Sequence, residues 1–203
     1  MTELRVHNLS ISLDGYVAGP DQSVDNPLGK GGEQLHEWIF SPDATETDRR
    51  FIDRGREGIG ATIMGRNMFG PVRGPWGDDD WTGWWGADPP FHHDVFVLTH
   101  QPRDPVPMAG GTTFHFVTEG IEPALERARA AAGGKAVRLG GGAATVQEYL
   151  RADLVDELHL AVVPVLLGSG ERLFEDLGNV LGGWSCVEFA PSQAVAHVRL
   201  RRR

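Results

Sequence analysis

Three consecutive glycines at residues 140–142 separate a strand pattern from a helix pattern, and this feature constrains the fold most strongly. Residues 137–139 have the character of the end of a short buried strand. After the glycines, apolar residues at 146, 149 and 150 have the spacing of one helix face. A strand rich in β-branched residues follows at 158–163 and ends before a proline. The sequence therefore predicts a strand, a glycine turn, a helix and a second strand.

The glycine turn allows two interpretations. Without Cβ atoms, the backbone N–H groups of Gly140, Gly141 and Gly142 can approach an anion, and the positive end of the next helix faces the same place. This favours a phosphate site. Glycines also permit a tight turn that only packs a helix closely on a strand. The spacing matches neither the dinucleotide fingerprint nor a P-loop, so both interpretations stay open on the glycines alone.

Composition excludes several classes of protein. With 203 residues, 40% of them apolar and 23% charged, the chain is typical of one globular domain spanning residues 1–203. Its net charge of -9 repels nucleic acid and anionic lipid, so neither is an expected partner. The sequence has no signal peptide and no membrane-spanning run, which predicts a cytoplasmic protein. Cys186 stands alone and the histidines lack metal-ligand spacing, so we expect no disulfide and no metal site.

Strand and helix patterns alternate through the middle of the chain, with a helix at 121–132, and two strands close it. The predicted strands cover residues 5–13, 61–64, 95–99, 114–117, 137–139, 158–163, 184–189 and 194–200. The last two are joined by a short turn. We therefore predict an α/β domain with a mainly parallel mixed sheet and a C-terminal antiparallel hairpin.

Residues 70–93 contain four tryptophans among glycine, proline and aspartate, without the period of a helix or a strand. Such a segment can be a lid that presents flat rings to a flat heterocycle. It can equally be a flap that buries its rings against the domain or against a twin subunit, because both arrangements use the same apolar area.

Five short motifs occur in an order that resembles the dihydrofolate reductase-like family, especially the branch shared with the C-terminal reductase domain of bacterial riboflavin biosynthesis. They are Ser-Leu-Asp-Gly-Tyr-Val-Ala at 12–18, Met-Gly-Arg-Asn-Met at 64–68, Leu-Thr at 98–99, Gly-Gly-Gly at 140–142 and Pro-Val-Leu-Leu-Gly-Ser-Gly at 164–170. Together they cover nearly the whole chain. The resemblance implies a dihydrofolate reductase-like three-layer α/β/α domain. No deaminase segment precedes the first strand, so we expect a reductase domain without one.

The resemblance implies NADPH as cofactor, lying across the carboxyl ends of the strands. Arg66 would pair with the ribose 2′-phosphate, as suits a guanidinium fork, and Met68 replaces a hydroxyl residue of folate reductases, leaving its backbone amide as the contact. The Gly140–Gly141 peptide is expected to be cis, as it often is in the family. The implied cofactor-binding residues are Val17, Ala18, Gly65, Arg66, Asn67, Met68, Thr99, His100, Gly140, Gly141, Gly142, Ala143, Ala144 and Thr145.

Four residues are candidates for chemistry or substrate binding. Asp14 follows the first strand, where it could bind a polar substrate or relay a proton, although Asp-Gly is also simply a good turn. Asp48 lies near the position of the acid that protonates folate in the family. Glu171 in the Gly-Ser-Gly-Glu-Arg loop is a candidate substrate contact, or an exposed loop acid. Trp76 is the candidate ring that contacts the substrate.

Two hypotheses follow. The first is an NADPH-dependent reductase, similar to 5-amino-6-(5-phosphoribosylamino)uracil reductase, that transfers hydride to a small pterin-like or aminopyrimidine-type heterocycle. The second is a non-catalytic nucleotide-binding module, or a reductase that uses a flavin or deazaflavin in the same cleft. The riboflavin-type branch implies a homodimer. The sequence does not identify the substrate.

Overall fold

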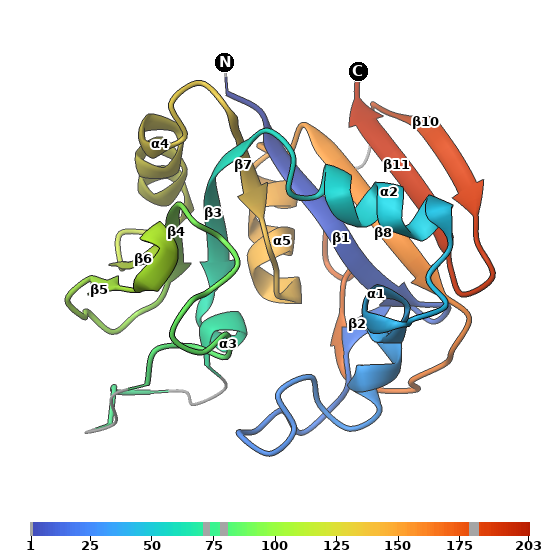
Figure 1. The fold of residues 1–203 in the computed structure, drawn as a ribbon, viewed down its shortest axis with the longest axis horizontal. Coiled ribbons are helices and arrows are strands. Elements are labelled where there is room, and N and C mark those ends of the chain that lie inside the picture. The colour runs from blue at the N-terminus through green and yellow to red at the C-terminus, as the bar shows by residue number, and fades with distance from the viewer. Residues whose placement is uncertain (1, 71–73, 78–80, 179–182) are drawn as a thin grey trace.

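The computed structural model describes residues 2–70, 74–77, 81–178 and 183–203. Within them, a nine-stranded sheet in the order β10-β11-β8-β1-β7-β3-β4-β6-β5 forms the middle layer (Figure 1). Its strands are β1 (Leu4–Ser12), β3 (Ile59–Gly65), β4 (Asp94–Leu98), β5 (Val106–Pro107), β6 (Thr113–Val117), β7 (Ala136–Leu139), β8 (Glu157–Val163), β10 (Trp184–Pro191) and β11 (Ala196–Arg202). The two short strands β2 (Tyr16–Ala18) and β9 (Glu171–Arg172) form a second sheet.

The six strands from β8 to β6 run parallel, and β10 and β11 form an antiparallel hairpin at one edge. This confirms the predicted mainly parallel sheet with a C-terminal hairpin. Because the strands are parallel, their carboxyl ends and the loops that follow them meet at one edge of the sheet. That edge holds the ends of β1, β3 and β7.

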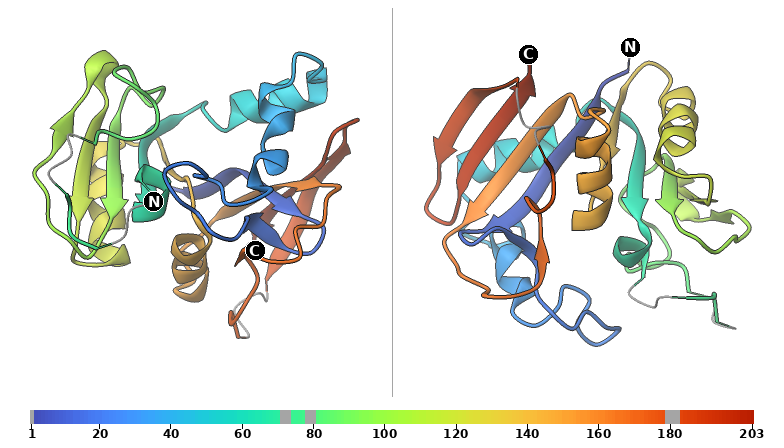
Figure 2. Two further views of the ribbon diagram at one scale, coloured as in Figure 1. Left: turned by 90° about the horizontal axis from the view of Figure 1, so that it is seen from below. Right: turned by 180° about the vertical axis from the view of Figure 1, so that it is seen from behind.

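Helices cover both faces of the sheet. The helices are α1 (Glu37–Phe40), α2 (Glu46–Arg54), α3 (Arg66–Phe69), α4 (Ile121–Ala131) and α5 (Ala143–Arg151), with two short 3₁₀ helices, η1 (Gly32–Leu35) and η2 (Ala109–Gly111). Figures 1 and 2 show α1 and α2 on one face and α4 and α5 on the other. None of the helices in the described part of the chain has the length and apolar character needed to cross a bilayer.

The main core lies between the sheet and the pair α4 and α5. Val146, Tyr149 and Leu150 form the buried face of α5, which confirms the stripe predicted from their spacing. The Tyr149 hydroxyl donates a hydrogen bond of 2.8 Å to the carbonyl oxygen of Ile121, at the start of α4. This buried polar tip therefore has a partner, and it fixes α5 against α4. The position of the α5 N-terminus follows from that packing.

The tryptophan-rich segment is a flap over the domain's own second core in the residues that the structure describes; residues 71–73 and 78–80 lie outside them. Trp76, Trp81 and Trp85 pack against a cluster around Phe69 and Phe114. The Trp81 indole N–H donates to the carbonyl oxygen of Phe69 at 2.8 Å. Of the two sequence interpretations, these contacts favour a flap buried on the domain over a lid of rings facing a ligand.

A chain of buried polar groups joins α2 to the hairpin. The backbone N–H of Asn8 donates to Nδ1 of His159, which leaves the proton of that ring on Nε2. Nε2 of His159 lies 3.1 Å from Nδ1 of His197, and Nε2 of His197 lies 2.9 Å from a carboxylate oxygen of Asp48. Both rings are fully buried. The hydrogen bonds therefore require both histidines to be uncharged.

We predict that the free energy of unfolding falls as the pH drops below about 6.5. Burial lowers the pKa of His159 from 6.5 to about 2. The unfolded chain therefore takes up the proton first, and stability is lost as the pH falls from 6.5 toward the folded-state pKa. Urea denaturation at about pH 7.5 and 5.5 should show a loss of about 1 kcal/mol from His159 alone.

Exposed His100 provides the matched control for this experiment. His100→Gln should keep the pH dependence of the wild type, whereas His159→Gln should reduce it. Equal stability of the wild type at the two pH values would contradict a neutral buried His159.

Candidate active site

The ends of β3 and β7 are joined by two backbone hydrogen bonds. Gly140 donates to the carbonyl oxygen of Ile63, and Gly65 donates to the carbonyl oxygen of Gly141, both at 2.8 Å. The cis peptide is Gly141–Gly142, so the expected cis bond at Gly140–Gly141 is wrong by one residue. The hydrogen bond from Gly140 to Ile63 gives the reason. Gly140 still continues the pairing of β7 with β3, and the cis peptide follows one residue later.

The glycine turn leads into an uncapped helix. Gly142 is the N-cap residue of α5, and in this described segment no side chain caps the helix and no acidic residue lies in its first turn. The amides of Ala143, Ala144 and Thr145 thus lie at the positive end of a nine-residue helix without an internal negative partner. Such an N-terminus can hold a phosphate group.

Two side chains pack tightly around the glycines. A Cβ atom at Gly140 would lie 3.1 Å from the sulfur of Met68, so Met68 fills the space beside the turn. A Cβ atom at Gly65 would lie 2.3 Å from the hydroxyl oxygen of Thr145. The structure thus brings Gly65, Met68, Gly140 and Thr145 together, as the sequence predicted. We name this group, with residues 141–144, the glycine cradle.

Arg66 starts α3 directly beside the cradle. Its Nη1 lies 3.4 Å from the hydroxyl oxygen of Thr99 at the end of β4, and its Nε is buried with no hydrogen-bond partner among the described residues. Burial lowers the pKa of Arg66, and the nearby charge of Arg103 lowers it further. Arg66 is therefore a partly desolvated cation with an unused donor, which is what an anionic ligand requires.

The guanidinium carbon of Arg66 lies over the ring of Trp76, 3.1 Å from the ring centroid. The Trp76 indole N–H donates to the carbonyl oxygen of Gln101 at 2.9 Å. Trp76 thus lies beside Arg66, with its ring packed on the second core and its N–H already used. Its role as a substrate contact stays a prediction.

Sequence reasoning missed Arg103 at this end of the site. Its guanidinium carbon lies 4.9 Å from the centroid of the Trp76 ring and 5.2 Å from that of Phe116. The signal available in the sequence was a cation a few residues beyond the end of a strand, and it was too common to single out. His100, which was expected near the same phosphate, is exposed, and Asn67 is half-buried in α3.

Val17 and Ala18 are buried in β2 at the other side of the carboxyl edge. Ala18 pairs with Glu171 of β9, and the Tyr16 hydroxyl oxygen accepts from Arg172 at 3.0 Å. The structure therefore places the loop acid Glu171 directly beside the segment expected along the nicotinamide. Among the described residues, no group of histidine, cysteine or acidic side chains has an arrangement that could hold a metal ion.

Asp14 connects β1 to the loop that follows β8. One carboxylate oxygen accepts from the Ser12 hydroxyl at 2.6 Å and from the Leu167 amide at 3.1 Å, and the other accepts from the Gly168 amide at 2.7 Å. These hydrogen bonds, that of Ser12 above all, lower the pKa of Asp14 to about 2. Asp14 is therefore ionised at neutral pH and is a poor proton donor.

Asp48 is held inside the domain instead of facing the carboxyl edge. One oxygen accepts from the Thr45 amide at 2.8 Å, which completes a capping box at the start of α2, and the other lies beside His197. Burial alone would raise the pKa of Asp48, but hydrogen bonds from Thr45, Ser192 and His197 outweigh it and lower the pKa. Its predicted catalytic role is therefore not supported, because the capping pattern explains its position.

Comparisons with known proteins show the family of this chain. Residues 6–196 match the family described as RibD C-terminal domain. The chain belongs to the RibD C-terminal domain family. It is 26% identical over 174 residues to the uncharacterized protein YwjB of Bacillus subtilis. The matched region covers 84% of this chain and 82% of that relative.

Solved structures show the fold of this family member. A putative riboflavin biosynthesis protein from Shewanella sp. PV-4 is 23% identical, with a TM-score of 0.66, and the match covers 100% of this chain and 99% of the other. Dihydrofolate reductase from Enterococcus faecalis, complexed with NADP(H) and RAB-propyl, is 16% identical, with a TM-score of 0.59 and coverage of 99% and 96%. The dihydrofolate reductase-like fold expected from the motifs is therefore confirmed.

We predict that Gly65→Ala destabilises the protein by about 1–3 kcal/mol, because the new methyl group overlaps the Thr145 hydroxyl and must displace it. The double variant Gly65→Ala/Thr145→Ala removes the atom that the methyl group meets. It should regain most of the stability lost in the single variant, and chemical denaturation of the four members of this cycle measures the coupling. Strictly additive effects would contradict the contact.

Proposed function

We propose that this protein is an NADPH-dependent reductase that transfers hydride to a small pterin-like or aminopyrimidine-type heterocycle. The observation that carries the proposal is the pairing of two positive sites at one edge of the sheet. One is the uncapped N-terminus of α5, and the other is Arg66 with its buried, unpartnered Nε. Membership of the RibD C-terminal domain family supports a reductase.

The residues present fit NADPH. In the proposal, the amides of residues 143–145 hold the pyrophosphate, because the glycine cradle has no Cβ atoms to keep it away and the helix end is positive. Arg66, together with Thr99, holds the ribose 2′-phosphate. Trp76 fixes the plane of the guanidinium by stacking on one of its faces. The bound cofactor would supply the hydride.

The rest of the edge would position the substrate. Val17 and Ala18 offer a buried apolar strand beside the expected nicotinamide, and Glu171 pairs with that strand. Asp14 would act by holding the 166–168 loop in place, since its carboxylate is already engaged by two amides of that loop. Hydride transfer depends mainly on such positioning in a site from which water is excluded.

A second candidate is a nucleotide-binding module without turnover. The observation that favours it is that the carboxylates of Asp14 and Asp48 both accept several hydrogen bonds within the protein. Neither is then suited to give a proton to a substrate. A flavin or deazaflavin in the same cleft would also use the cradle, but it would not need the cation pair Arg66 and Arg103.

We predict that Arg66→Gln weakens NADPH binding about 10- to 100-fold and NADH binding much less, because the 2′-phosphate is the group that NADH lacks. Titration of each nucleotide, followed by tryptophan fluorescence, measures both dissociation constants. Arg49→Gln is the matched control, because Arg49 is an exposed arginine on α2.

Equal losses of NADPH and NADH affinity would contradict the role of Arg66. Tight binding of a flavin or deazaflavin, with no binding of NADPH by the wild type, would overturn the proposed cofactor. Binding of NADPH without its oxidation by any pterin or aminopyrimidine tested would favour the non-catalytic module.

We also predict that Glu171→Gln raises the KM for the heterocycle about tenfold and leaves the dissociation constant of NADPH unchanged, since Glu171 lies on the substrate side of β2 in this proposal. Glu175→Gln, which changes an exposed acid shortly after β9, is the control. An unchanged KM, or a change in NADPH binding alone, would contradict the assignment.

A further inference from the structure

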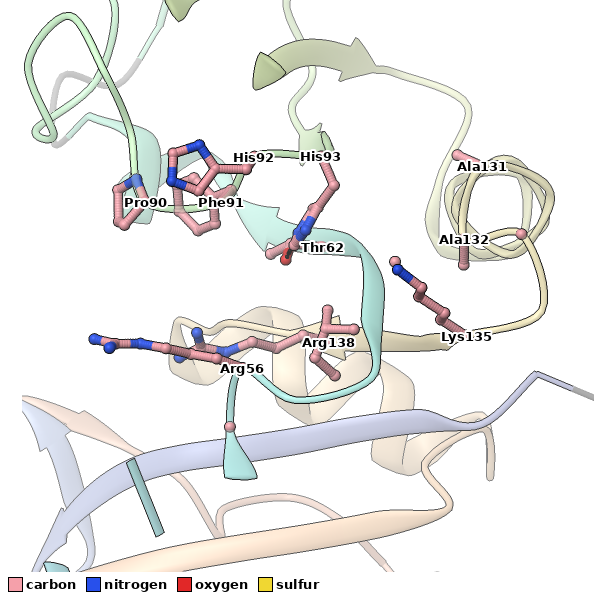
Figure 3. Close-up of a pocket in the computed structure, with 14 residues that line it drawn as sticks. Arg56, Thr62, Pro90, Phe91, His92, His93, Ala131, Ala132, Lys135 and Arg138 are labelled. Atoms are coloured by element: carbon pink, nitrogen blue, oxygen red, sulfur yellow. Dashed lines mark hydrogen bonds between the residues drawn. The ribbon is translucent and has the colours of Figure 1, made fainter. Parts of the chain in front are cut away.

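A cavity of about 380 Å³ lies toward the opposite end of β3 from the glycine cradle, and Figure 3 shows its lining residues. It runs along Gly60 and Thr62, near the start of the strand, whereas Gly65 ends the strand at the cradle. The turn after α2, the segment 90–93 and the end of α4 complete its walls. We call it the basic cavity.

The basic cavity concentrates positive charge in an acidic protein. Arg56, Lys135 and Arg138 line it, and no aspartate or glutamate is among its lining residues, although the chain carries a net charge of -9. In the part of the chain that the structure describes, none of these three cations forms an ion pair. Figure 3 shows Arg56 and Arg138 along one side and Lys135 on another.

Arg138 is the most informative of the three. It stands on β7 in register with Thr62 of β3, so both side chains lie on the same face of the sheet. Its Nε is buried without a hydrogen-bond partner among the described residues, and its Nη2 reaches the His7 carbonyl oxygen only at 3.5 Å. Burial, and then the charge of Arg56, lower the pKa of Arg138 to about 10.

Two neighbouring guanidinium groups without a carboxylate cost free energy, and an anion between them would remove that cost. The unused Nε of Arg138 would gain an acceptor at the same time. A single cation that stabilises the C-terminus of α4 would not explain this arrangement, because Arg56 lies in the turn after α2 and Arg138 lies on β7.

The uncharged part of the cavity suits the body of a small molecule. Burial is the main reason that the pKa of His93 is lowered to about 4, so this ring is neutral at pH 7, and it is joined to the Thr62 hydroxyl at 2.8 Å. The carboxylate of the adjacent Asp94 already has a partner, because its Oδ1 lies 2.9 Å from Nε2 of His115. Phe91 and Ala132 add apolar wall. The size of this cavity falls within the range of small-molecule sites.

We propose that the basic cavity binds the phosphoryl group of a small phosphorylated molecule, with Arg56, Lys135 and Arg138 around the phosphate and with Phe91 and Ala132 against the remainder. The site is separate from the glycine cradle, and it stands whether or not the cradle binds NADPH.

Isothermal titration with inorganic pyrophosphate tests this assignment. The double variant Arg56→Gln/Lys135→Gln should weaken binding to the basic cavity by at least about tenfold, since it removes two charges from exposed side chains. Arg138→Met should do the same, with circular dichroism to report folding. The charge-matched control is Lys30→Gln/Arg49→Gln, two exposed residues elsewhere, and it should bind as the wild type does.

Pyrophosphate can also enter the cradle, so Arg66→Gln is titrated in parallel. Pyrophosphate binding that survives Arg66→Gln and is lost in Arg56→Gln/Lys135→Gln supports the basic cavity. A second supporting result is that the wild type binds two pyrophosphate molecules and each of these variants binds one. Binding that is lost only in Arg66→Gln overturns the proposal, as does equal weakening by the charge-matched control or an absence of binding at about 10 mM.

Discussion

The two backbone hydrogen bonds between the ends of β3 and β7 are the constraint on which the carboxyl edge depends. Gly140 and Gly65 each donate across the gap, so the turn after β7 cannot move without the end of β3. Little room is left for side chains at these glycines, since a methyl group at Gly65 would overlap the Thr145 hydroxyl and a Cβ atom at Gly140 would lie 3.1 Å from the Met68 sulfur. The result is a fixed relation between the start of α5 and the start of α3, where Arg66 lies.

Positive charge is distributed unevenly in this acidic chain. At the carboxyl end of β3, Arg66 and Arg103 surround the ring of Trp76 beside the glycine cradle. Near the amino end of the same strand, Arg56 and Arg138 lie together in the basic cavity. Each location holds a partly buried guanidinium group with an unused Nε in the described structure. A net charge of -9 therefore disfavours polyanions overall while leaving two local sites suited to small anions.

The sequence predicted well those features that depend on local pattern. The parallel sheet, the hairpin and the helix after the glycines followed from apolar periodicity, and motifs next to strand ends singled out Arg66 and Thr99, which lie close together. The sequence could not reveal where side chains from distant segments compete for one group. The carboxylate of Asp48 accepts hydrogen bonds within a capping box and from His197. The ring of Trp76 contacts Arg66 and packs on a core that forms only in three dimensions. The basic cavity joins residues from five segments, which no local pattern can reveal.

A crystal structure of the protein with NADPH is the sharpest test of the proposed cofactor site. We expect the pyrophosphate against the amides of Ala143, Ala144 and Thr145, and the 2′-phosphate within hydrogen-bonding distance of Arg66 and Thr99. We also expect the nicotinamide beside Ala18. A cofactor bound with its pyrophosphate away from the N-terminus of α5, or with Arg66 contacting no phosphate, would contradict the proposed cofactor site.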